Sequence, residues 1–189
     1  NFFKFFACLF LIFSWLLSGW PPIWQNPRIP PKIREVQAAV TYVASSAHVT
    51  NGTTATLTIS KPTGTVNNDI MIAVINQKGN QVITAPAGWT LIHTINNGII
   101  NQATVFWKRA ASEGTSYNFT KPTDDNLLWH GAISSFSGTV TSVSPIDTGT
   151  GAPTEIANAS SNTITATGID PTVANTMVIF AAFRGDDFT

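Results

Sequence analysis

Polar and apolar residues alternate along much of the chain after residue 40. In residues 54–60, threonine and serine occupy every second position, and Ala55, Leu57 and Ile59 lie between them. A period of two is typical of a half-buried strand, because successive side chains point to opposite faces of a sheet. Residues 69–75 (DIMIAVI) are apolar at nearly every position, which indicates a central strand that is covered on both faces.

Six further segments carry strand signals, and turn residues separate them. The segments are residues 89–95, 103–108, 116–120, 127–136, 163–166 and 177–184. Asn96-Asn97-Gly98 lies between the first two and predicts a hairpin, since asparagine and glycine tolerate positive φ. No segment in residues 41–189 combines a 3.6-residue apolar period with helix caps. We therefore predict an all-β domain over residues 41–189, built as a jelly-roll-like, two-sheet antiparallel sandwich.

The first 40 residues have a different pattern from the rest of the chain. Residues 1–20 contain one lysine before an apolar run at residues 5–17, which has the length of a signal-peptide core and is shorter than the ~20 residues that span a bilayer. We expect a hydrophobic leader helix over residues 1–20 that serves as a signal peptide or a membrane anchor. Residues 21–40 begin with five prolines in eleven positions and are expected to form a Pro-rich, extended spacer.

Processing and the chain ends also bear on the expected organisation. Val36-Gln37-Ala38 matches a small-residue cleavage pattern, and Ser18-Gly19 offers a second candidate position. The single cysteine, Cys8, lies in the leader, so we expect no disulfide in the β domain. The chain does not begin with methionine and ends soon after an apolar segment, and we therefore expect a piece of a longer protein whose sandwich is truncated at its C-terminal end.

Low charge points to an exterior location. Charged residues make up 11% of the chain, well below the roughly 25% of an average globular protein. From Ala39 onward there are six Lys/Arg and nine Asp/Glu, a net charge of 6 − 9 = −3, and no basic patch. We therefore expect no nucleic-acid partner, because the chain lacks the positive charge that binds phosphates. A Thr/Ser/Asn-rich surface favours a secreted or cell-surface protein. Only the leader is expected to contact a membrane.

Three segments together resemble a known family. They are residues 84–90 (TAPAGWT), 105–110 (VFWKRA) and 135–147 (SFSGTVTSVSPID), with Asn67-Asn68-Asp69 leading into an apolar strand. Their order is similar to that of uncharacterised β-sandwich modules in large bacterial secreted or surface proteins and in phage structural proteins. The resemblance implies a jelly-roll-like sandwich with an adhesive or structural role, and it carries no catalytic residues. We expect Trp89 to cap one end of the core and Trp107 to face inward.

The sequence favours no catalytic or metal chemistry. His48, His93 and His130 are far apart along the chain and lack the spacing of metal ligands. Glu113 and Glu155 are the only glutamates after residue 40, and both lie in expected turns or loops, whereas a glycosidase needs two carboxylates across a cleft. We therefore expect neither an enzyme nor a bound cofactor.

One loop is the best candidate for ligand binding. Asp124, Asp125 and Asn126 are consecutive, and Trp129 follows them in the next expected strand. Clustered side-chain oxygens are calcium ligands, and a carboxylate or amide beside an aromatic ring is typical of a sugar site. The alternative is a solvated turn in which the Asx side chains bond to the loop backbone.

Three functional hypotheses follow from these features. The first is a non-catalytic extracellular module of a larger surface or secreted protein, used for cell adhesion or carbohydrate binding, with a glycan or a protein surface as ligand. The second is a structural building block of a virion or appendage. The third is a carbohydrate-active enzyme or its accessory domain. Exposed aromatic rings would favour glycan binding, whereas a polar surface with one apolar patch would favour assembly. The sequence indicates no oligomeric state.

Overall fold

The structure is a computed structural model that describes residues 39–98, 100–141, 143–147 and 170–181. The chain divides into two compact units, Asn1–Val36 and Gln37–Thr189. The expected leader (1–20) and nearly all of the expected spacer (21–40) lie outside the described residues. The described residues contain no helix that is long and apolar enough to cross a membrane.

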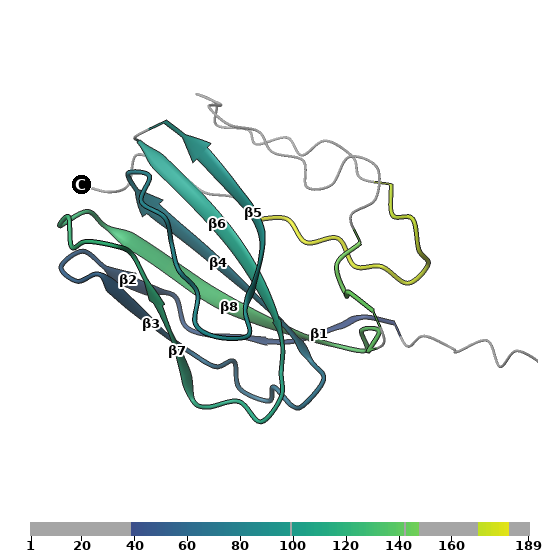
Figure 1. Cartoon of the computed structure of the whole chain (residues 1–189). Coiled ribbons are helices and arrows are strands. Elements are labelled where there is room, and N and C mark those ends of the chain that lie inside the picture. The colour runs from purple at the N-terminus through teal and green to yellow at the C-terminus, as the bar shows by residue number, and fades with distance from the viewer. Residues whose placement is uncertain (1–38, 99, 142, 148–169, 182–189) are drawn as a thin grey trace, which may run out of the picture. The chain divides into compact units, whose positions relative to one another are not determined.

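The described part of the chain is all-β, as predicted, with antiparallel strands in two sheets (Figure 1). The larger sheet has the order β1-β8-β4-β6-β5, and β2 also pairs with β8. The smaller sheet consists of β3 and β7. The bounds of the strands are β1 (Thr41–Ser45), β2 (Val49–Asn51), β3 (Thr56–Ser60), β4 (Ile70–Lys78), β5 (Thr90–Asn97), β6 (Asn101–Arg109), β7 (Ser116–Thr120) and β8 (Trp129–Ser137).

The main core lies between the two sheets and follows from the alternation in β3 and β7. Leu57, Ile59 and Phe119 are completely buried, and the intervening Thr58 and Asn118 are exposed, where the threonine hydroxyl donates a 2.8 Å hydrogen bond to the asparagine. The predicted hydroxyl-bearing outer face is therefore confirmed. The facing side chains of the larger sheet complete this core and are Met71, Ala73, Ile75, Phe106, Trp129 and Ile133.

A second apolar cluster lies on the opposite face of the larger sheet. Ile70, Ile72 and Phe136 form its buried centre, and Trp107 and Met177 pack against it. Trp107 was expected to face inward, and it packs, partly buried, against this second cluster and not in the main core. Phe106 faces the core, so its neighbour Trp107 points to the other side of the sheet. Trp89 does cap the core, because its ring contacts Tyr117 and Phe119 at centroid distances of 5.1 and 5.4 Å.

Most of the predicted strands exist, and the differences lie near the ends of the domain. The hairpin at Asn96-Asn97-Gly98 is confirmed, since β5 and β6 pair as far as Asn97 and Asn101. The expected strand at 177–184 is not formed over its described residues, 177–181. The expected strand at 163–166 lies outside the described residues. The short strands β1 and β2 were not predicted, and both pair with β8.

Gly131 gives a direct test of the packing between the sheets. A Cβ at this position would lie 3.0 Å from the Val74 carbonyl oxygen and 3.1 Å from side-chain atoms of Ile59 and Ile75. Gly131→Ala should therefore lower the free energy of unfolding by about 1–3 kcal/mol through overpacking. Gly114→Ala is the matched control, because a Cβ there meets nothing within 4 Å. Urea unfolding checks both, and equal effects would contradict the packing described.

Candidate functional site

The loop between β7 and β8 holds the residues that were predicted to bind a ligand. It begins at Lys121, which is 4% exposed despite its charge. The Lys121 ammonium pairs with the Asp125 carboxylate, donates to the Leu127 carbonyl at 3.2 Å, and lies 5.4 Å from the centroid of the Trp129 ring. The buried Lys121 ammonium therefore contacts residues along the whole loop and holds them together.

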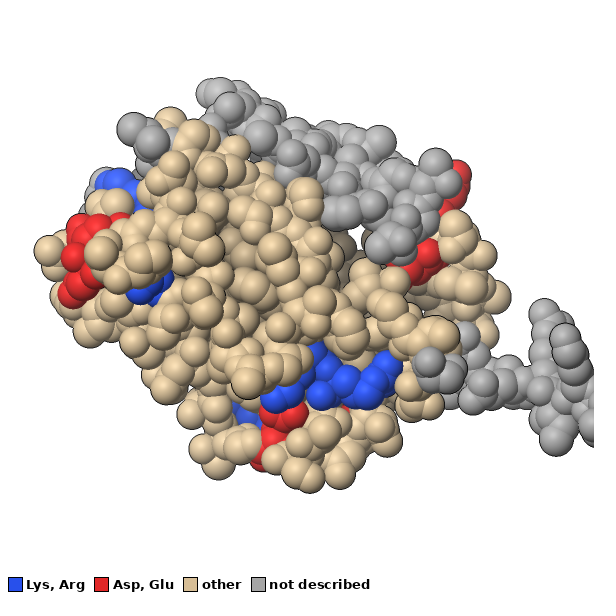
Figure 2. All heavy atoms as spheres, viewed as in Figure 1, with Lys and Arg blue, Asp and Glu red and all other residues tan. Residues whose placement is uncertain are grey.

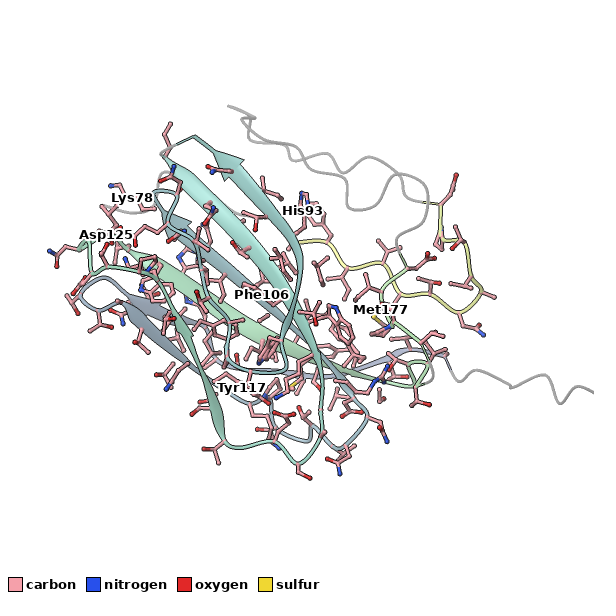
Figure 3. All side chains as sticks on the ribbon, in the orientation of Figure 1. Lys78, His93, Phe106, Tyr117, Asp125 and Met177 are labelled. Atoms are coloured by element: carbon pink, nitrogen blue, oxygen red, sulfur yellow. The ribbon has the colours of Figure 1, made fainter. Side chains whose placement is uncertain are left out.

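Glutamine side chains tie this loop to the neighbouring strands. Gln81 donates to the Asp125 carboxylate, and its own side-chain oxygen accepts a hydrogen bond from the Thr123 backbone at 3.2 Å. Gln77 of β4 donates to the Gln81 carbonyl and to the Gln102 side chain. Figure 3 shows Asp125 at the same end of the sandwich as Lys78. These bonds hold the loop against the end of the larger sheet.

Both oxygens of Asp125 already accept protein hydrogen bonds. Oδ1 accepts from Lys121 and from the Leu127 backbone N–H, and Oδ2 accepts from Gln81. Burial alone would raise the pKa of the Asp125 carboxyl, but these hydrogen bonds and the lysine charge lower it below its ordinary value. Asp125 is thus held as a carboxylate whose charge is compensated inside the protein.

Asp124 and Asn126 do not converge with Asp125 on a common point. Both are exposed, and the Asp124 carboxylate accepts a 3.2 Å hydrogen bond from the Asn126 backbone N–H. Asn126 adopts a left-handed conformation with φ 55°. This is the Asx turn that we gave as the alternative to a ligand site. Calcium binding by these three residues stays a prediction, and at Asp125 calcium would have to compete with the Lys121 ammonium.

Trp129 occupies the core instead of the surface. Its exposed fraction is 0%, and its indole N–H donates a 3.2 Å hydrogen bond to the Thr54 carbonyl. Stacking on a sugar requires an accessible ring face. In this structure Trp129 therefore offers no ring face to a sugar, and ligand binding by this loop stays a prediction. The sequence could not separate the two roles, because strand alternation does not say which face of β8 is covered.

Glu113 lies in a second network of charged groups, at the other end of β7. Its carboxylate is 2.8 Å from the Lys108 ammonium, and it accepts hydrogen bonds of 2.9 Å from the Tyr117 hydroxyl and the Ala111 N–H. Burial acts to raise the pKa of Glu113, and these partners lower it below 4.5. Glu155, the other glutamate considered, lies outside the described residues. Figure 2 shows charged side chains gathered in a few such places on a largely uncharged surface.

The hydrogen bonds and ion pair of Glu113 should make the free energy of unfolding depend on pH in the acidic range. Because the folded-state pKa is below the unfolded value of 4.5, the unfolded chain binds more protons as the pH falls. The contribution is present above pH 4.5 and is lost as the pH falls through the folded-state pKa. Glu113→Gln should be less stable than wild type near neutral pH and should lose less stability on acidification. Urea unfolding from about pH 7 to pH 3 checks this, and identical pH profiles would contradict it.

Two histidines that are distant in sequence come together in the fold. The ring centroids of His48 and His130 are 4.9 Å apart, with the ring planes at 50°. His48 directly precedes β2, which pairs with β8 beside His130. Sequence reasoning separated these residues because β2 was not predicted. His93 lies on β5 (Figure 3), at the other edge of the larger sheet.

The site residues therefore fall into three groups: the loop around Lys121, the Glu113 network and the histidine pair. None of the groups in the described ranges brings together three or more His, Cys, Asp or Glu side chains in a way that could hold a metal ion. Comparison of the chain with protein-family models, with curated proteins and with solved structures finds no match.

Proposed function

We propose that this chain carries a non-catalytic β-sandwich module of an extracellular or virion protein, and that the module works by association with another protein surface. The observation that carries the proposal is the apolar segment at residues 177–181. Val178, Ile179 and Phe180 are 58%, 47% and 59% exposed. Contiguous exposed apolar residues on a soluble domain are typical of an association surface.

This segment has the sequence of a buried strand. Residues 172–181 align without a gap with residues 65–74, which lead into β4, and four of the ten positions are identical (Thr, Val, Asn and Ile). The backbone agrees as well, because Asn68 and Asn175 occupy equivalent positions and have φ values of 74° and 61°. Residues 177–181 therefore correspond to the start of β4, which lies in the centre of the larger sheet.

A strand that is apolar on both faces needs neighbours on both faces and a partner for its backbone. The described part of the larger sheet has two edges, one formed by the short strands β1 and β2 and the other by the longer strand β5 (Figure 1). β5 is eight residues long (TLIHTINN) and contains neither proline nor a Lys, Arg, Asp or Glu, although it has an irregular register between Leu91 and His93. Long uncharged edge strands readily pair with other chains. We assign the segment to the β5 edge of a second copy of the module.

Association with protein has more support than the other roles we considered. A tryptophan platform for a glycan needs an exposed ring face, and the described tryptophans, Trp89, Trp107 and Trp129, are partly or completely buried. The Glu113 carboxylate is engaged with Lys108 and Tyr117. A sparsely charged surface suits an exterior location and close contact between copies.

Sedimentation velocity of the Gln37–Thr189 unit tests the proposal. Wild type should associate as its concentration rises, and Ile179→Lys should stay monomeric, because a lysine at the exposed segment opposes burial. Val82→Lys is the matched control, since Val82 is 70% exposed and lies outside the segment. Circular dichroism confirms that each variant is folded. Wild type that remains monomeric throughout, or equal effects of the two lysines, would contradict the proposal.

A further inference from the structure

The histidine pair lies on the face of the larger sheet that points away from β3 and β7. Trp129 of β8 and Gln77 of β4 point toward the smaller sheet, so their neighbours His130 and Asn76 point to the opposite side. His130 pairs directly with Asn76 on one side and with Thr50 of β2 on the other. His48 is two residues from Thr50 and is exposed, so it approaches His130 from the solvent side.

The spacing of the two rings is that of imidazoles that share a metal ion. An imidazole nitrogen binds zinc at about 2.0–2.1 Å, which places the metal about 3.2 Å from the ring centroid. Two rings with a ligand angle of about 90–110° then have centroids about 4.5–5.2 Å apart. The centroids of His48 and His130 are 4.9 Å apart. The distance between these two rings therefore lies in the range that a shared metal ion requires.

Asn76 adds a buried side-chain amide close to the two histidines. It is 1% exposed, and among the described residues neither its amide oxygen nor its amide nitrogen has a hydrogen-bond partner. Leaving such a group unpaired in the interior is unfavourable by about 1–3 kcal/mol. Directly opposite residues in an antiparallel pair have Cβ atoms about 4.5–5.5 Å apart, so the Asn76 amide lies beside the His130 ring.

We propose that His48 and His130, with the Asn76 amide oxygen as third protein ligand, bind a divalent transition-metal ion that prefers imidazole, of the class of Cu²⁺, Ni²⁺ and Zn²⁺. Imidazole nitrogen and amide oxygen suit these ions, whereas calcium takes oxygen ligands only. Water completes the coordination on the exposed side of His48. The site differs in ligands and position from the loop around Lys121, and it does not depend on the proposed association.

The strand pairing holds the two histidines close together. His130 lies in β8, and His48 directly precedes β2, which pairs with β8 through Val49–Gly131 and Thr50–His130. The ligands are therefore positioned before the ion arrives.

Copper alone is the probe, and the full chain in mild non-ionic detergent is the sample. We expect one Cu²⁺ per chain by equilibrium dialysis, with nitrogen hyperfine structure in the electron paramagnetic resonance spectrum. His48→Gln and His130→Gln should each weaken binding more than about tenfold, since even outer-shell changes at metal sites have effects of that size. His93→Gln is the matched control and should bind as wild type does. Cys8 and the N-terminal amine are present in every variant, so their contribution cancels.

The variants also decide the role of Asn76. Asn76→Leu should weaken copper binding while it leaves the metal-free protein folded, because leucine removes an unpaired buried amide at similar volume. Unchanged affinity in Asn76→Leu would overturn its role as third ligand. Copper that binds equally to wild type, His48→Gln and His130→Gln, or that does not bind at all, would overturn the site. Circular dichroism and thermal melting without metal verify that each variant is folded.

Discussion

Trp129→Ala should lower the free energy of unfolding by about 3–5 kcal/mol, one of the largest effects of any single substitution in the domain. The Trp129 side chain is completely buried, its N–H bonds to the Thr54 carbonyl, and its ring lies under the Lys121 ammonium. Truncation would leave a large cavity between β8 and the smaller sheet and an unpaired carbonyl beside it. Urea or thermal unfolding of the folded domain measures the effect.

The matched control for Trp129→Ala is Tyr42→Ala. Tyr42 is also aromatic and on a strand of the larger sheet, but it is 53% exposed and makes an edge contact with Phe136. We expect its loss to change stability by less than about 1.5 kcal/mol, the range of an aromatic pair. A small effect of Trp129→Ala, comparable with that of Tyr42→Ala, would contradict the core position of Trp129 and reopen its role as a ligand platform.

Asp125→Ala should lower the free energy of unfolding by about 2–3 kcal/mol. Loss of one partner from a buried ion pair is unfavourable by about 3–5 kcal/mol, and the value is reduced here because Asp125 is partly exposed. The Lys121 side chain is only 1% exposed, so its ammonium would remain buried without a counter-charge. Chemical unfolding near neutral pH measures the difference.

Asp124→Ala is the matched control, one residue away in the same loop. Asp124 is exposed and accepts one hydrogen bond, from the Asn126 N–H, so we expect a change of no more than about 1 kcal/mol. The same pair of variants addresses calcium. A calcium-dependent rise in the melting temperature of wild type that both substitutions abolish would support a calcium site. Equal destabilisation by the two substitutions without calcium would contradict the buried ion pair.

The fold could be predicted largely from alternation. The period-two pattern in residues 54–60 identifies both the buried and the hydroxyl-bearing face of β3, because each side chain's direction follows from its position. Asn96-Asn97-Gly98 identifies the β5–β6 hairpin through the backbone angles that it permits. Both signals are local, and both are confirmed. The apolar segment at residues 177–184 is a local signal too, but it is not a strand over its described residues, 177–181.

The errors concern information that is not local. β1 and β2 are short, and they become strands because β8 lies beside them. Trp107 and Trp129 both alternate with apolar neighbours, and only the position of the smaller sheet decides which face is the main core. The proximity of His48 to His130 depends on the unpredicted pairing of β2. The likeness of residues 172–181 to residues 65–74 is faint in sequence and became evident through the shared left-handed asparagines.

The charged loop residues show a further limit of sequence reasoning. Asp124, Asp125 and Asn126 form a compact set of oxygen-bearing side chains in the sequence. In the fold, Asp125 turns toward Lys121 and Gln81, and Asp124 bonds to its own loop. Whether neighbouring acidic residues face a common ligand or separate protein partners depends on buried cations nearby. Lys121 gives no sign in the sequence that it is buried.

Hydrogen exchange at residues 177–181 tests the proposed association most directly, because strand pairing protects backbone amides. Mass spectrometry of the exchanged Gln37–Thr189 unit follows the peptide that contains these residues over a range of protein concentrations. We predict rapid exchange in dilute protein and protection that increases with concentration, accompanied by protection of β5. Rapid exchange at every concentration would contradict the proposed strand addition, and so would protection that is already complete in the dilute monomer.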